Sequence, residues 1–178
     1  MGSFQLASLL LVLALSLLSS EARISRPATT TLAKDLDAAF AKLAKTKGYS
    51  IISGTSYTSQ VKKAVLASGV KTITFLAPND AASQAAEQNP DLISAGGTTV
   101  VEYHTFPTLY TATQLSGLPA NAKILTGAGS SMIKTSAQGK TPVKLKSPKA
   151  KAVATVIQTV YSGTKVVILG IDTVLLPA

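Results

Sequence analysis

The 178-residue sequence contains no cysteine and a single histidine, His104. Without a second histidine or a cysteine, a zinc or copper site of ordinary composition cannot be built. Seven acidic residues follow residue 22, and they are scattered without the alternation of a calcium-binding loop. They are Asp35, Asp37, Asp80, Glu87, Asp91, Glu102 and Asp172. We therefore expect no metal and no other cofactor.

Catalytic motifs are also missing from the sequence. There is no Gly-x-Ser-x-Gly elbow, and nothing in the spacing selects a nucleophile to act with His104. Gly127–Ser130 lacks the length and the lysine of a phosphate-binding loop. We interpret His104 as a partly buried ring that bonds backbone groups, and Asp172 as the anchor of a loop. The sequence predicts a protein that is not an enzyme.

Acidic residues are few beside the basic ones, with 8 Asp and Glu against 17 Lys and Arg, a formal net charge of +9. Such an excess attracts polyanions. Lys144 and Lys146 alternate with Val143 and Leu145, which places both lysines on the solvent side of one strand. The full cluster is Lys140, Lys144, Lys146, Lys149 and Lys151. Two interpretations remain open: a patch for acidic polysaccharide or another anionic surface, and a solvated edge that deters strand pairing.

Aromatic residues are scarce, at 5% of the chain, and tryptophan is absent. No aromatic residue interleaves with the lysine cluster, so stacking platforms for single-stranded nucleic acid are missing. We do not expect a nucleic-acid partner.

One long apolar run is present, from Leu6 to Leu18. It is too short to span a bilayer comfortably, and Ser20-Glu21-Ala22 offers small residues at the two positions that signal peptidase recognises. We predict a secretory signal over 1–22, a flexible lead-in over 23–31 and a single domain over 32–178. No anchor signal follows the last predicted strand, so we expect a secreted, extracellular protein without a membrane anchor.

The hydrophobic pattern predicts a mixture of helices and strands. Helical spacing or capping residues indicate helices over 32–43, 59–68, 80–88 and 100–103. β-Branched and apolar runs bounded by turn residues predict strands over 72–76, 123–126, 131–135, 143–146, 151–161 and 165–174. The last strand is almost continuously apolar, which indicates that both of its faces are covered.

Three ordered stretches resemble the sequence signatures of the fasciclin domain family. Thr74–Ala82, with the letters TFLAPNDAA, is similar to the first, Val100–Pro107 to the second, and Ile171–Pro177 to the closing one. The matching positions are Thr74, Phe75, Ala77, Pro78, Asn79, Asp80, Tyr103, His104, Pro107 and Asp172. The resemblance covers residues 35–177 and implies an α+β fold, a wedge of two packed β-sheets flanked by several helices.

The same resemblance implies a non-enzymatic protein of the cell surface or extracellular matrix that binds matrix components or mediates adhesion. In some family members the Tyr-His region and a nearby Asp-Ile pair are tied to receptor binding. Here Tyr103 and His104 match, but the later position has Thr159-Val160, without the acid. A second departure is Ser83, where the family usually has a bulky aromatic residue. Its loss leaves room against the core, or the volume is refilled from elsewhere.

An alternative function follows from the single-domain plan. Certain secreted fasciclin-like proteins of green algae bind carotenoids, and this chain is similar to them in its predicted organisation. The alternative is a water-soluble carrier of an apolar small molecule such as a carotenoid. Its tunnel would be contacted by the apolar residues of the 32–43 helix and the last strand, which are otherwise ordinary core. We also expect a single apolar wedge closed at Phe75, Tyr103 and Val174.

Overall fold

The computed structural model describes residues 31–90, 97–148 and 152–177. The predicted signal, most of the lead-in, Lys149 and Lys151 lie outside these ranges. The elements are α2 (Leu32–Ala44), α3 (Thr55–Ala67), β1 (Ile73–Pro78), α4 (Asp80–Glu87), α6 (Gly97–Tyr103), β2 (Thr105–Phe106), α7 (Ala112–Gly117), β3 (Lys123–Leu125), β4 (Ser131–Lys134), β5 (Lys144–Lys146), β6 (Val153–Ser162) and β7 (Val166–Ile171). None of the helices in the described ranges is both long and apolar enough to cross a membrane.

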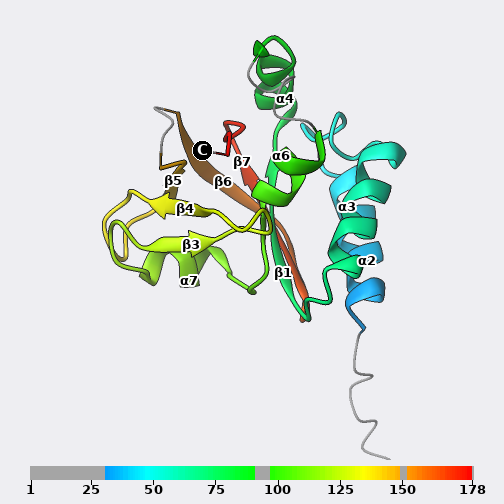
Figure 1. Ribbon diagram of the computed structural model, residues 1–178, viewed down its shortest axis with the longest axis horizontal. Coiled ribbons are helices and arrows are strands. Elements are labelled where there is room, and N and C mark those ends of the chain that lie inside the picture. Colours follow the sequence, from blue (N-terminus) through cyan, green and yellow to red (C-terminus); the bar gives the residue numbers. More distant parts are fainter. Residues whose placement is uncertain (1–30, 91–96, 149–151, 178) are drawn as a thin grey trace, which may run out of the picture.

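The strands form the predicted wedge, and its two sheets are joined through one long strand. The strand order is β2-β1-β7-β6-β5-β4-β3, in which β1 and β7 are parallel and the other neighbours are antiparallel (Figure 1). Pairing between β6 and β7 shifts register at Val156/Gln158 and at Thr159/Tyr161. Such irregularities bend a strand, so β6 can serve both sheets.

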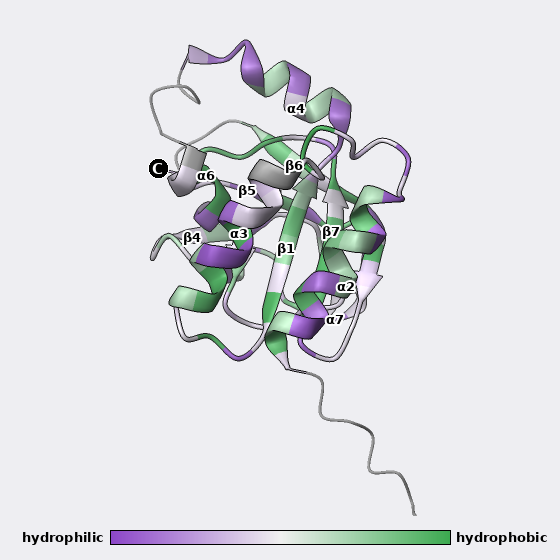
Figure 2. Cartoon of the chain, turned by 90° about the vertical axis from the view of Figure 1, so that its right-hand side faces the viewer, coloured by the Kyte–Doolittle hydropathy of each residue, from purple (hydrophilic) through white to green (hydrophobic). Residues whose placement is uncertain are grey.

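Helices α2 and α3 lie on one side of β1 and β7 (Figure 1). Both strands are buried along their whole length. For the last strand, the almost continuous apolar run in the sequence predicted this burial. Figure 2 shows hydrophobic residues along β1 in the centre, with hydrophilic and hydrophobic segments alternating on α2. The α+β architecture therefore places its helices over the most apolar part of the sheet.

The buried side chains form two clusters, so the expectation of one wedge closed at Phe75, Tyr103 and Val174 is wrong. Phe75 belongs to the cluster under α2 and α3, whereas Tyr103 belongs to the cluster between the two sheets. Consecutive strand residues point to opposite faces, which puts Phe75 in one cluster and Leu76 in the other. Val174 is only partly buried and belongs to neither.

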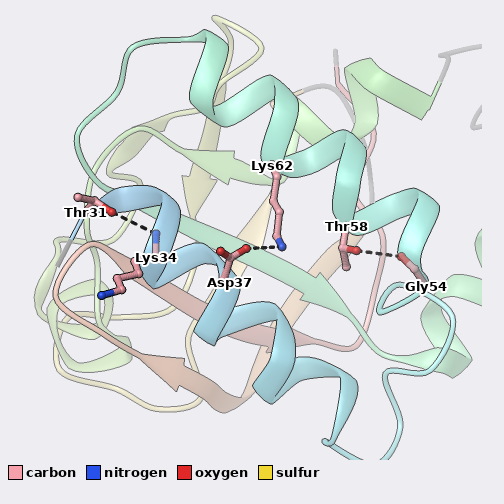
Figure 3. Close-up of polar contacts among 6 residues, drawn as sticks. All are labelled: Thr31, Lys34, Asp37, Gly54, Thr58 and Lys62. Carbon is pink, nitrogen blue, oxygen red and sulfur yellow. Dashed lines mark hydrogen bonds and ion pairs between the residues drawn. The ribbon is translucent and has the colours of Figure 1, made fainter.

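A polar contact joins α2 to α3, and others lie at the start of each helix (Figure 3). The Thr31 side chain caps α2 by accepting from the backbone N–H of Lys34. Lys62 of α3 forms an ion pair with Asp37 of α2, with 2.6 Å between Nζ and Oδ1. Helix α3 begins at Thr55, before the predicted start at Ser59, and Tyr57 in its first turn packs against Phe75.

The sequence did not predict α7, although its start carries a recognisable signal. Thr111 and Gln114 form a capping box, in which each side chain bonds the backbone N–H of the other residue.

The last strand ends at Ile171 rather than at Val174, because Asp172 turns the chain there. Its Oδ1 accepts from the backbone N–H of Thr155 at 2.7 Å, which confirms the interpretation of Asp172 as a loop anchor.

Candidate functional site

The junction between β1 and α4 is built as its sequence predicts. Asn79 caps α4, with its Oδ1 accepting from the backbone N–H of Ala82 at 2.8 Å. The Asp80 carboxylate accepts from the N–H of Ile51 and the hydroxyl of Ser50, both at 2.9 Å. Burial alone would raise the pKa of Asp80, but these hydrogen bonds outweigh it and lower the pKa. The junction therefore holds the segment around residues 50–52 beside α4.

His104 lies where α6 passes into β2, fully buried rather than partly buried as expected. Its Nδ1 lies 2.8 Å from the carbonyl oxygen of Val100, and its Nε2 lies 3.1 Å from the backbone nitrogen of Leu175. A carbonyl can only accept and an amide can only donate, so the ring is neutral with its proton on Nδ1. Both ring nitrogens bond backbone groups, as predicted, and neither is available to a substrate.

An apolar cleft of about 280 Å³ opens between the segment 51–57, α4, α6 and the C-terminal segment. We call it the Ser83 cleft. Its lining residues are Ile51, Ile52, Tyr57, Pro78, Ser83, Ala86, Glu87, Val100, His104 and Val174. Pockets for small molecules are usually lined in this way, mainly by apolar groups with a few polar ones.

Ser83 stands at the position where the resemblance to the fasciclin family implies a bulky aromatic residue. The structure shows open space beside Ser83. The missing ring therefore leaves room against the core, and its volume is not refilled from elsewhere. Ser83 is 7% exposed, and its buried Oγ has no hydrogen-bond partner among the described residues. A buried hydroxyl without a partner costs about 1–3 kcal/mol, so a ligand oxygen that bonded it would be stabilised.

A second cleft, of about 450 Å³, lies on the other side of α4. Ala86 and Val174 line both clefts. The remaining lining residues of the second are Asn79, Ala81, Ala82, Ala85, Asn89, Ala152, Asp172 and Thr173. Helix α4 carries mainly alanine on the sides that face the two clefts, and such short side chains leave both spaces open.

Most of the family-motif residues are buried and hold the fold together, although Asp172 is exposed. Tyr103 is fully buried, and its hydroxyl donates to the carbonyl of Ser131. Thr74 accepts from the N–H of Tyr110 and donates to the carbonyl of Thr108. Because Tyr103 and His104 are both buried, neither side chain is placed to contact a protein receptor.

The apolar residues of α2 and β7 that were considered for a ligand tunnel are packed as core. Leu36 and Leu43 of α2 are fully buried in the same cluster as Ile168 of β7. Sequence reasoning missed the position of the Ser83 cleft, and its one available signal was the small residue at position 83. Among the described residues, no three of the His, Cys, Asp and Glu side chains lie together where they could hold a metal ion.

The lysine cluster is only partly within the described ranges. Lys140 and Lys144 are exposed and Lys146 is half-buried, with Leu145 buried between the latter two, as the alternation predicted. Binding of acidic polysaccharide to these residues stays a prediction. Sequence reasoning missed Lys134, which is fully buried and whose Nζ donates to the carbonyls of Leu118, Ser136 and Ala137.

Comparison with known proteins gives a family match and a structural likeness. The profile of the Fasciclin domain family matches residues 46–177. No curated protein matches the chain. The chain is similar to the solved structure of a FAS1 domain pair from the insect cell adhesion molecule Fasciclin I, with a TM-score of 0.53 and 17% sequence identity. The match covers 79% of this chain and 45% of that one, so this chain spans just under half of the domain pair. At this identity the likeness shows the fold.

Proposed function

The chain belongs to the fasciclin domain family, and we propose that it is a non-enzymatic, extracellular binding module that holds an apolar small molecule in the Ser83 cleft. The observation that carries the proposal is the coincidence of apolar walls with a buried Ser83 hydroxyl that has no partner among the described residues. Apolar walls favour an apolar ligand, and the hydroxyl favours one that carries an oxygen atom.

Tyr57 also lines the cleft, and we propose its hydroxyl as the second polar group that contacts the ligand. Burial raises the pKa of Tyr57, so the phenol stays protonated and can donate a hydrogen bond at neutral pH. Glu87 lines the same cleft but is exposed to solvent. The ligand that fits these groups is an uncharged apolar ring that carries a hydroxyl or keto group.

A carotenoid with oxygenated end rings has this chemistry. The cleft, at about 280 Å³, suits an end ring better than the whole molecule. The polyene chain would continue past Ala86 and Val174 into the second cleft, because these two residues line both spaces. We propose this arrangement for a carrier role.

Loading of the purified protein with two carotenoids tests the proposal. Zeaxanthin and β-carotene share one skeleton, but only zeaxanthin carries ring hydroxyls. After incubation and gel filtration, the protein fraction should retain the visible absorption of zeaxanthin and much less of β-carotene. A colourless protein after both incubations would overturn the carrier role, and equal loading would overturn the assignment of a polar contact at Ser83.

Adhesion by binding matrix components is the second candidate function. It is supported by the likeness to a domain pair from an insect cell adhesion molecule and by the net charge of +9, which attracts acidic polysaccharide. The apolar run Leu6–Leu18 supports export. Retention on an acidic-polysaccharide column with a steep salt dependence, unchanged by a filled Ser83 cleft, would favour this candidate over the carrier role.

A further inference from the structure

One face of the sheet formed by β3, β4, β5 and β6 has an unusual composition. Directly paired residues share a face, and the register pairs Lys123 with Ile133, Ile133 with Lys146, and Lys146 with Val153. Leu125 pairs with Ser131, and Lys144 with Thr155, in the flanking rows. We call this the outer face. Its members are Lys123, Leu125, Ser131, Ile133, Lys144, Lys146, Val153 and Thr155.

The outer face exposes large aliphatic side chains. Leu125 is 59% exposed and Val153 is 39% exposed. Residues of the opposite face, such as Met132 and Leu145, are fully buried in the cluster between the sheets. Three other large hydrophobic residues in the described part of the chain are comparably exposed, Ile51, Leu66 and Ile157. Ile133 lies between Leu125 and Val153 in the register, and exposed apolar patches rimmed by polar residues mark protein or membrane interaction sites.

The charges of the outer face are all of one sign. Lys123, Lys144 and Lys146 alternate with the aliphatic side chains across the strands, and the face includes no acidic residue. Asp172 lies at its margin, where its carboxylate bonds the backbone N–H of Thr155. The face is therefore complementary to a surface that is both negatively charged and apolar just beneath the charge.

We infer that the outer face docks on an anionic lipid bilayer. The lysine ammonium groups meet the lipid headgroups while their methylene stems lie along the apolar side chains. Leu125 and Val153 enter the boundary between headgroups and acyl chains, where their apolar area leaves water. An acidic polysaccharide would use the lysines alone, since it offers no apolar phase and the face has no aromatic ring to stack on sugars. This docking surface is separate from the Ser83 cleft.

Vesicle binding of the purified protein tests the inference. Vesicles of phosphatidylcholine with phosphatidylserine should bind the protein, and vesicles of phosphatidylcholine alone should bind it far less. Changing Lys123, Lys144 and Lys146 together to Gln should weaken binding about a hundredfold, at about fivefold for each lysine. The double change of Leu125→Ser and Val153→Ser should weaken it by at least about tenfold. Matched controls are Lys34, Lys42 and Lys63 changed to Gln, and Leu66→Ser, all exposed on α2 or α3.

The protein has no tryptophan, which allows a second measurement that does not depend on weakened binding. In Leu125→Trp, the emission should shift to shorter wavelength when phosphatidylserine vesicles are added, because the ring enters the bilayer boundary. Leu66→Trp should not shift. The inference is overturned by a lack of vesicle binding, by an unshifted Leu125→Trp emission, or by binding that depends on the lysines but not on the aliphatic residues. The last result, with strong heparin binding, would assign the face to acidic polysaccharide.

Discussion

The imidazole of His104 accepts a hydrogen bond from the backbone N–H of Leu175, with 3.1 Å between Nε2 and the amide nitrogen. The other ring nitrogen donates to the carbonyl of Val100 at 2.8 Å. The neutral ring therefore joins the end of α6 to the C-terminal segment, which carries Val174 into the wall of the Ser83 cleft. A protonated ring would bring an N–H of Nε2 against the N–H of Leu175 and break this link.

Stability should fall as the pH falls from 6.5 to 4. Burial lowers the pKa of His104 from its ordinary value of 6.5 to about 4. Between these values the unfolded chain binds a proton at His104 and the folded chain does not, so acid favours unfolding. The shift corresponds to roughly 3 kcal/mol, at about 1.4 kcal/mol per pH unit. Denaturant unfolding at pH 7.0, 5.5 and 4.5 measures the effect. An equally steep loss in His104→Gln would show that other groups cause it.

Asp35→Asn should destabilise the fold by about 3 kcal/mol. The buried Asp35 carboxylate accepts hydrogen bonds from the Tyr161 hydroxyl and from the backbone N–H groups of Lys165 and Val166, which ties α2 to the turn before β7. The hydrogen bond between the Tyr161 hydroxyl and Asp35 raises the pKa of Tyr161 to about 12. Asp37→Asn is the control, because its carboxylate is exposed and its surface ion pair contributes less than about 1 kcal/mol. Similar losses in both variants would contradict this role for Asp35.

Gly170→Ala should destabilise the fold by about 2 kcal/mol or more, because a Cβ at this position of β7 would overlap the Tyr49 hydroxyl. Tyr49 is buried, and its hydroxyl accepts from the side chain of Gln158 at 3.0 Å. In a Tyr49→Phe background the closest obstruction is gone, so Gly170→Ala should cost about 1 kcal/mol less. A double-mutant cycle by denaturant unfolding measures this coupling, and simple additivity of the two changes would refute the contact.

Local chemistry explains how much of the fold the sequence predicts. The Asn79 cap, the buried β1 and β7, and the alternation around Leu145 follow from residue types within a few positions. The short α7 was missed because its six residues give too little hydrophobic periodicity, although its capping box was present in the sequence. The two separate core clusters depend on which faces of β1 and β7 meet which elements, and that is a property of the whole topology.

The candidate site was harder to predict, for the same reason. The cleft is formed by segments from four parts of the chain, and the sequence signalled only the small residue at Ser83. The burial of Lys134 was equally hard to predict, because a charged side chain is expected in solvent. Its position in β4 directs the side chain inward, where Nζ bonds three carbonyl groups. Some of these contacts join residues that are distant in sequence, and others depend on the shape of a loop. Neither the hydrophobic periodicity nor the residue spacing of the sequence predicts them.

Filling the Ser83 cleft tests the central claim most directly. Ser83→Phe places an aromatic ring in the space, and Gln84→Phe adds the same ring to an exposed position of α4 that lines neither cleft. We measure the visible absorption that each purified variant retains after incubation with zeaxanthin and gel filtration. The account predicts that Ser83→Phe retains about tenfold less than the unmodified protein, while Gln84→Phe retains the full amount. Equal retention by a folded Ser83→Phe protein would contradict the account.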